Sequence, residues 1–292
     1  MAQEYSKIQW FPGHMAKARR KIEESISKVD LVLELCDARI PRSSRNPMLR
    51  SMLRSKPRLL LLNKSDLADP VQTARWLSYF ESKRVSALAI DAKSGKNIKK
   101  ILPGAREILS ERIAAWENRG MVGRSIRIMV VGIPNVGKSA LINALCRGSG
   151  IGKAEVRDQP GVTRENRWFT IGKGFDLLDT PGVLWHKFDD PRQGEALAFT
   201  GAVNDEIIDT YELALHLLKK LLILAPGKLT DRYKLSQEEL SLSEEALLET
   251  IALRRGMLAS GAAADTERCA QMLLDEFRGG KIGQITLEQV EE

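Results

Sequence analysis

The stretch Gly132-Ile-Pro-Asn-Val-Gly-Lys-Ser139 fits the pattern G-x-x-x-x-G-K-[ST], between an apolar run at 125–131 and a helix-forming run at 140–146. Its glycines let the backbone curl so that N–H groups point at a phosphate, and the dipole of the following helix adds positive potential. Lys138 offers a charge to the β- and γ-phosphates, and the Ser139 hydroxyl suits Mg²⁺. The stretch therefore predicts a phosphate loop between a buried strand and a helix.

A second turn, Asp179-Thr-Pro-Gly182, follows the apolar run 175–178. A protein with a phosphate loop needs a carboxylate to hold the Mg²⁺ shell, and Asp179 is expected to supply it through water. The N–H of Gly182 would then reach the γ-phosphate, which makes the chain after it sensitive to hydrolysis. Between the two motifs, Thr163 is the candidate for a second hydroxyl on Mg²⁺, and an ordinary exposed loop threonine is the alternative.

A base-binding motif, Asn63-Lys-Ser-Asp66, ends the apolar run 58–62. The carboxylate of Asp66 can accept both N1–H and the N2 amino group of guanine, Asn63 can serve O6 and N7, and the stem of Lys64 can lie along the base. Adenine lacks those two donors and would leave a desolvated carboxylate unpaired. The motif therefore predicts guanine binding and opposes an ATP-dependent kinase. The backbone N–H groups of Asp91-Ala-Lys93, after the next predicted strand, would complete the pocket.

Strand and helix patterns alternate in the first two thirds of the chain, which predicts an α/β domain with a parallel sheet. The predicted strands are 29–36, 58–62, 86–90, 125–131, 168–171 and 175–178, and the predicted helices are 16–28, 70–83 and 97–119. From about residue 205 the pattern is helical only, with helices at 207–224 and 263–278 and another that begins at a cap, Ser243. We therefore expect two domains, 1–204 and 205–292.

The net charge of +7 is unevenly distributed. Residues 1–204 hold 35 Lys/Arg against 21 Asp/Glu, whereas residues 205–292 hold 10 against 17. Within the basic part, residues 38–65 contain no acidic residue. Their cations are Arg39, Arg42, Arg45, Arg50, Arg54, Lys56, Arg58 and Lys64. Such a stretch suits a polyanion such as RNA, and a solvated surface is the alternative.

The cysteines and the apolar runs indicate in which cellular environment the chain is expected. Cys36, Cys146 and Cys269 are scattered and form no metal-binding spacing, so a reducing cytosol is expected and neither a disulfide framework nor a zinc site is. No apolar run is long enough to cross a bilayer, and the N-terminus has no apolar signal core. We expect a cytoplasmic, monomeric protein with no membrane partner.

Along the chain, the two base motifs come first, the phosphate loop follows, and Thr163 and Asp179-Thr-Pro-Gly182 come last. A closed α/β domain tolerates such an order when circular permutation moves only its termini. Together with the flanking segments, the pattern resembles the circularly permuted GTPases, specifically the ribosome-biogenesis GTPase A family of bacteria, which has mitochondrial relatives. The segments that carry the resemblance are Trp10-Phe-Pro-Gly-His-Met15, Asp37-Ala-Arg-Ile-Pro41, Asn63-Lys-Ser-Asp66, Gly132-Ile-Pro-Asn-Val-Gly-Lys-Ser139, Asp179-Thr-Pro-Gly182 and Phe277-Arg-Gly-Gly-Lys-Ile-Gly283. The resemblance covers nearly the whole chain.

The resemblance implies a P-loop GTPase fold, circularly permuted, with a mostly parallel sheet, helices on both faces and a C-terminal all-helical domain. It implies a GTPase that acts on precursors of the large ribosomal subunit and contacts rRNA and ribosomal proteins. The implied contacts to GTP or GDP are Asn63, Lys64, Ser65, Asp66, Asp91, Ala92, Lys93, Asn135, Val136, Gly137, Lys138, Ser139, Ala140, Thr163 and Gly182. Two departures are Asp91-Ala-Lys93 for the commoner Ser-Ala-Lys, and Pro160-Gly-Val-Thr163 for the commoner P-G-T-T.

The resemblance also bears on hydrolysis, because Val183 stands where Ras-like enzymes place the glutamine that orients water. An apolar side chain cannot orient water, so intrinsic turnover should be slow. The family implies that Asn135 binds a potassium ion in place of an arginine finger and that His14 approaches the γ-phosphate once the partner is bound. A structural or RNA-contacting role for His14 stays open.

Two further expectations concern the movement of the helical domain and the role of hydrolysis. Because the chain runs from Gly182 to the helical domain, we expect the nucleotide state to move that domain. The favoured function is a GTPase stimulated by its ribosomal partner, and the alternative is a nucleotide-gated RNA-binding scaffold in which hydrolysis is incidental. Stimulation of turnover by ribosomal particles distinguishes the two.

Overall fold

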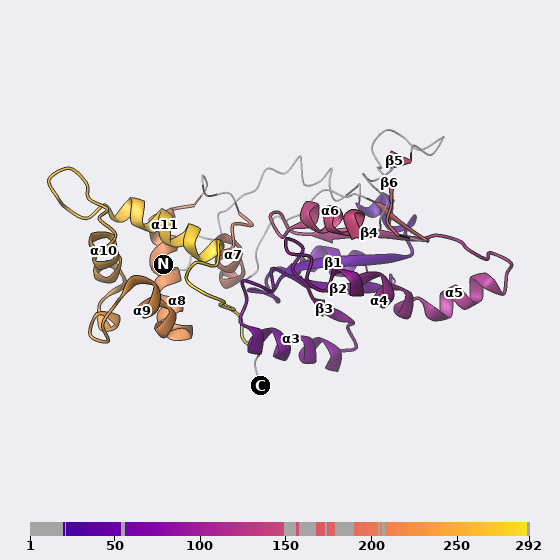
Figure 1. Ribbon diagram of the computed structural model, residues 1–292, viewed down its shortest axis with the longest axis horizontal. Helices are drawn as coiled ribbons and strands as arrows, with labels where there is room; N and C mark the ends of the chain where they lie inside the picture. Colours follow the sequence, from indigo (N-terminus) through magenta and orange to yellow (C-terminus); the bar gives the residue numbers. More distant parts are fainter. Residues whose placement is uncertain are drawn as a thin grey trace.

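The structure, a computed structural model, describes residues 20, 22–53, 56–148, 156–157, 168–172, 174–178, 190–203, 205 and 208–290. In this part of the chain, a seven-stranded sheet lies beside a group of helices (Figure 1). The strands are β1 Leu31–Asp37, β2 Arg58–Asn63, β3 Ala87–Ala89, β4 Ile126–Gly132, β5 Val156–Arg157, β6 Trp168–Thr170 and β7 Phe175–Leu178. Their order across the sheet is β3-β2-β1-β4-β7-β6-β5.

The predicted parallel sheet is present and has an antiparallel edge. β3, β2, β1, β4 and β7 run parallel, whereas β6 pairs antiparallel with β7 and with β5. The six predicted strands all form. β5 was not predicted, because two residues are too short for an alternating pattern to show.

The helices predicted in the described residues form, one of them in pieces, and three further helices, at 47–52, 191–199 and 226–233, were not predicted. The predicted helix 97–119 forms as three pieces, Ile98–Lys100, Ile101–Ile108 and Ser110–Glu117, with a break between the last two at Leu109. The helices are α2 Pro47–Met52, α3 Pro70–Ser82, η2 Ile98–Lys100, α4 Ile101–Ile108, α5 Ser110–Glu117, α6 Lys138–Gly148, α7 Pro191–Phe199, α8 Thr210–Leu224, α9 Pro226–Tyr233, η4 Glu239–Ser241, α10 Glu244–Arg254 and α11 Thr266–Arg278. The predicted cap is confirmed, because Ser243 Oγ accepts the Ala246 N–H. Most of the predicted helix 16–28 lies outside the described residues.

The sheet separates two apolar layers. Along β1, Leu31, Leu33 and Leu35 face the layer that holds α4 and α6, and Val32 and Cys36 face the opposite layer with α2 and α3. This alternation is what a strand covered on both faces requires. None of the described helices is long and apolar enough to cross a membrane.

The chain returns from the helices to the sheet at its end. The C-terminal segment, residues 279–290, leaves α11 and runs back beside α3 (Figure 1). Its Ile285 N–H donates to the Leu67 carbonyl at 2.9 Å, and the Trp76 indole N–H donates to the Glu288 carbonyl at 2.8 Å. On the helical side, α7 packs against α8 and α11. The domain boundary between residues 204 and 205 stays a prediction.

Candidate nucleotide site

The predicted base and phosphate motifs meet at one edge of the sheet. β4 ends at Gly132, where the phosphate loop begins, and β2 ends at Asn63, where the base motif begins. β1 lies between them and ends at Asp37, which pairs in register with Asn63. Because these strands are parallel, their carboxyl ends share an edge, which is where α/β sheets bind ligands. The reversed order of the motifs in the sequence therefore does not separate them in space.

Two glycines shape the phosphate loop. A Cβ on Gly132 would lie 2.6 Å from the Leu35 carbonyl oxygen, so only glycine allows β4 to approach β1 this closely. Gly137 has φ +101°, in the left-handed region, and a Cβ there would overlap the amide nitrogen of Asn63. The second glycine therefore keeps room for the base motif as well as for a phosphate.

Lys138 folds back over its own loop. Its Nζ donates to the Ile133 carbonyl at 2.8 Å and to the Gly132 carbonyl at 3.4 Å. The charged oxygens of a phosphate are stronger acceptors than these carbonyls. Ser139 follows in the first turn of α6 and is exposed. Its hydroxyl fits as one ligand of Mg²⁺, an ion that, when bound, neutralises phosphate charge.

Asn63 connects the phosphate loop to residues 91–93, the second base loop. Its Nδ2 donates to the Val136 carbonyl at 2.8 Å, and its Oδ1 accepts the Ala92 N–H at 2.9 Å. The residue is 3% exposed. Asn63 therefore sets the distance between the two loops, and its predicted contact with O6 and N7 of guanine stays a prediction.

Lys64 and Asp66 point in different directions. Lys64 has φ +59°, and its Nζ lies 2.9 Å from Asp37 Oδ2. Asp66 is exposed, as its predicted role requires, and its backbone carbonyl accepts the Gln284 Nε2–H. Between them, the Ser65 N–H donates to the Ile90 carbonyl at 3.1 Å. The lysine of the base motif is thus held by the end of β1.

Asp91 builds the second base loop from within. Its Oδ1 accepts the N–H groups of Lys93 at 2.8 Å and Ser94 at 3.2 Å. Burial raises the pKa of the Asp91 carboxyl, but hydrogen bonds from Ser94 and Lys93 outweigh burial and lower it below its ordinary value. An ionised aspartate therefore accepts the N–H groups of this loop more strongly than the serine hydroxyl of the commoner Ser-Ala-Lys motif would. Contacts of this loop with the base stay predictions.

The remaining predicted residues divide into described and undescribed ones. Asn135 has φ +55°, is exposed, and donates through Nδ2 to the Gly201 carbonyl at 2.7 Å. Its Oδ1 is the oxygen with which it would bind a potassium ion. His14, Thr163, Asp179, Gly182 and Val183 lie outside the described residues.

Two buried residues at the end of β1 were not predicted as part of the site. Asp37 receives the guanidinium of Arg39 at 2.8 and 2.9 Å, and both side chains are at most 2% exposed. Burial alone would raise the pKa of Asp37, but Arg39 and Lys64 beside it hold that pKa well below its ordinary value. The sequence signal was the pair Asp37 and Arg39 at the end of a buried strand. This pair served only as evidence for the family resemblance and was assigned no role in the site.

The basic stretch 38–65 is largely internal, so its interpretation as a surface for polyanions is wrong for half of its cations. The inward ion pairs are Arg39 and Lys64 with Asp37, and Arg45 and Arg58 with Glu34. Both carboxylates stand on β1, just before the stretch begins. The side chains of Arg50 and Arg54 lie outside the described residues.

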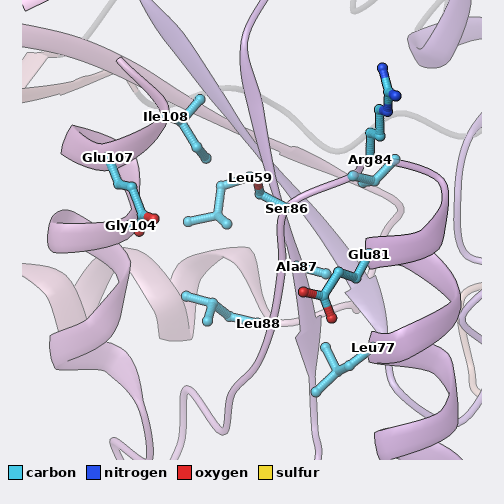
Figure 2. A pocket seen from close by; sticks show the side chains of 11 residues that line it. Leu59, Leu77, Glu81, Arg84, Ser86, Ala87, Leu88, Gly104, Glu107 and Ile108 are labelled. Atoms are coloured by element: carbon cyan, nitrogen blue, oxygen red, sulfur yellow. The ribbon is translucent and has the colours of Figure 1, made fainter. Parts of the chain in front are cut away.

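A separate cavity of about 680 Å³ lies at the open edge of the sheet, beside β3. Figure 2 shows Leu59, Leu88 and Ile108 around it, with Glu81 of α3 and Glu107 of α4 on opposite walls. Two carboxylates against one guanidinium, that of Arg84, give the lining a net negative charge that disfavours a triphosphate, and no phosphate loop reaches this edge. The edge where β4, β1 and β2 end is therefore the candidate nucleotide site.

Comparisons with known proteins place the chain among GTPases. A family model described as a 50S ribosome-binding GTPase matches residues 127–251. The ribosome biogenesis GTPase A of Priestia megaterium is 45% identical over 98% of both chains. The mitochondrial ribosome-associated GTPase 1 of Mus musculus is 35% identical over 96% of this chain and 90% of its own. GNP-bound YlqF from T. maritima is 26% identical, with a TM-score of 0.65 over 94% of this chain and 98% of that one.

The chain belongs to the ribosome biogenesis GTPase A family. It is accordingly a GTPase, and the predicted circularly permuted P-loop fold is confirmed. The matched segment begins at β4, so the base motif at Asn63 lies before it, as permutation requires. GTPases of this kind generally use Mg²⁺, and the hydroxyl of Ser139 fits it.

Proposed function

We propose that this GTPase is an assembly factor that binds precursors of the large ribosomal subunit through rRNA and ribosomal proteins, promotes a late maturation step, and hydrolyses GTP faster on the particle. It would act as a cytoplasmic monomer. The names of its relatives support a ribosomal partner, and the description of the matching family model supports the large subunit.

The observation that carries the RNA part of the proposal is a lysine cluster beside the base loop. It comprises Lys93, Lys96, Lys99 and Lys100, all exposed. None of the four forms an ion pair with another described residue. Each ammonium is thus free to neutralise a phosphate and release a counterion. The cluster begins next to Ala92, whose N–H is bound to Asn63, so RNA bound here would lie against the nucleotide site.

The proposal assigns roles within the site. Asn63, Asp66 and the loop 91–93 bind guanine, and the phosphate loop with Lys138 binds the phosphates. Mg²⁺ is held by Ser139 and Thr163, and by Asp179 through water. Asn135 holds a potassium ion, and His14 assists turnover only on the particle.

Steady-state GTP hydrolysis tests the function most directly. The full chain is assayed alone, with mature large subunits and with precursor large subunits, each in potassium and in sodium buffer. We expect slow turnover alone, the strongest stimulation by the precursor, and a further gain in potassium. The Lys138→Ala variant serves as the control for contaminating hydrolases in the particles. Equal rates with and without particles would favour the nucleotide-gated scaffold instead.

The His14→Ala variant tests the assignment of the N-terminal histidine. We expect it to lower particle-stimulated turnover and to leave GDP and GTP affinity intact. A structural or purely RNA-contacting role would instead weaken binding to the particle without changing turnover of the bound complex. Equal stimulated rates at saturating particle would remove His14 from the mechanism.

A further inference from the structure

The end of β1 joins the base motif to the helical domain through one guanidinium. Arg39 donates through Nε and Nη2 to the Asp37 carboxylate, which also holds Lys64. Its third nitrogen, Nη1, donates to the carbonyls of Phe277 at 3.4 Å and Arg278 at 3.3 Å, at the end of α11. The Arg39 guanidinium also lies over the Phe277 ring, 5.3 Å from its centroid. A chain of buried polar contacts therefore runs from Lys64 to α11.

A second set of contacts joins the same two regions. The C-terminal segment holds the residues that directly follow the base motif. Gln284 Nε2 donates to the Asp66 carbonyl at 3.0 Å, the Ile285 N–H to the Leu67 carbonyl at 2.9 Å, and the Asp69 N–H to Thr286 Oγ1 at 3.1 Å. The Leu287 N–H completes the set by donating to the carbonyl of Arg39 at 2.8 Å. The base motif is thus held on both sides by contacts that depend on residues 277–287.

We infer that Asp37 is a positioning residue for Lys64, and that Asp37 and Arg39 couple guanine binding to the docking of the C-terminal segment. The inference rests on the proposed base contacts of Asn63 to Asp66. A ligand that orders the base motif stabilises every contact that needs the same arrangement, and by linkage the docked segment strengthens guanine binding. The helical domain thereby senses whether the base site is filled.

This coupling differs from the movement expected through the segment after Gly182. It acts through the base, which GDP and GTP share, and not through the γ-phosphate. It therefore distinguishes an occupied site from an empty one and treats the two nucleotides alike. A cavity of about 500 Å³, lined by Arg39, Lys64 and Arg278 among others, lies beside these contacts. The phosphate loop makes a separate contact, from Asn135 Nδ2 to the Gly201 carbonyl at 2.7 Å, which does not involve the base motif.

Hydrogen exchange on the wild-type chain tests the coupling without any variant. The amide groups of Ile285 and Leu287 donate to residues beside the base motif, so their exchange reports docking. We expect GDP and a non-hydrolysable GTP analogue to slow both amides equally, by about 10-fold. Amides of α5, which has no contact with the base motif, should not respond. Unchanged exchange at both amides on adding GDP, or protection by the GTP analogue alone, would overturn the inference.

Paired variants on β1 test the positioning role of Asp37. Asp37→Asn removes the charge that holds Lys64, whereas Glu34→Gln removes an equally buried carboxylate that pairs with Arg45 and Arg58 and touches no nucleotide loop. We expect Asp37→Asn to weaken binding of a fluorescent GDP by about 10-fold and to abolish the GDP-dependent protection at residues 285 and 287. Glu34→Gln should change affinity by less than about twofold. Equal losses of affinity in the two variants would reduce Asp37 to a structural role.

A separate variant tests the base assignment on which the inference rests. Asp66→Asn replaces an acceptor of the guanine N1–H and N2 groups by an amide that can donate to the C2 carbonyl of xanthine. We expect the variant to prefer xanthosine diphosphate over GDP. Retention of the GDP preference would refute the base assignment, whereas a switched preference with unresponsive amides at 285 and 287 would refute only the coupling.

Discussion

The basic stretch 38–65 and the lysine cluster at 93–100 look alike in the sequence and differ in the structure. Both are rich in cations and poor in acidic residues. In the first, Arg39 is fully buried against Asp37, and Arg45 is mostly buried against Glu34. In the second, every lysine is exposed and unpaired with described residues. A count of charges within a window therefore overlooks partners that stand just outside it.

The chemistry of the two cations explains which region turns inward. A guanidinium is planar, weakly hydrated and able to bind a carboxylate with two parallel hydrogen bonds, so arginine can be buried as a pair. A lysine ammonium is a compact and strongly hydrated charge, which favours the surface. The stretch 38–65 is mostly arginine, and the cluster 93–100 is only lysine. Residue type thus carries information that net charge does not.

The largest effect should come from Arg39→Ala. This change leaves the Asp37 carboxylate buried with Lys64 as its one remaining cationic partner, and it removes the contacts of Arg39 with Phe277 and Arg278. We expect a loss of about 3 kcal/mol in the free energy of unfolding. Urea unfolding followed by circular dichroism measures it. A loss below about 0.5 kcal/mol would show that this arginine behaves like a surface cation.

The lysine cluster should show the opposite profile. Lys93→Gln, Lys96→Gln, Lys99→Gln and Lys100→Gln together should leave the free energy of unfolding within about 0.5 kcal/mol of wild type, because no described partner is lost. Affinity for precursor large subunits should fall by about 10-fold, and the salt dependence of binding should become shallower. Binding isotherms at several potassium chloride concentrations measure both.

A matched control removes the same net charge elsewhere on the sheet domain. Lys28, Lys83, Arg112 and Arg119 are also exposed, and changing each to Gln alters the total charge equally. The control should lose less affinity and keep the wild-type salt slope. Equal losses in both fourfold variants would mean that only overall charge matters, and that the cluster is not a docking surface.

The strands and the motifs could be predicted because each depends on local sequence. Apolar runs of strand length located the sheet, and the glycine spacing of 132–139 located the phosphate loop. The roles of Asp37 and Arg39 could not be found in this way, because their partners are Lys64 and, at the far end of the chain, Phe277 and Arg278. Such contacts arise from strand order and from the return of the chain, which no local pattern encodes.

The smallest effect is a pH dependence that only the buried region should show. The folded-state pKa of Asp37 lies well below its ordinary value of 3.8, so its ionised form stabilises the fold above that pH. This stability is lost progressively as the pH falls below about 4, because the unfolded chain binds the proton first. Relative to Asp37→Asn, wild type should lose about 1 kcal/mol between pH 7 and pH 3. Urea unfolding of both proteins across this range gives the difference.

The fourfold lysine variant and wild type should instead change nearly in parallel, because hydrogen bonds from Ser94 and the Lys93 backbone, which the substitutions keep, lower the pKa of Asp91 more than the Lys93 charge does. A constant gap between wild type and Asp37→Asn would mean that Asp37 has an ordinary pKa, and that the ion pairs at the end of β1 contribute no more than surface charges do.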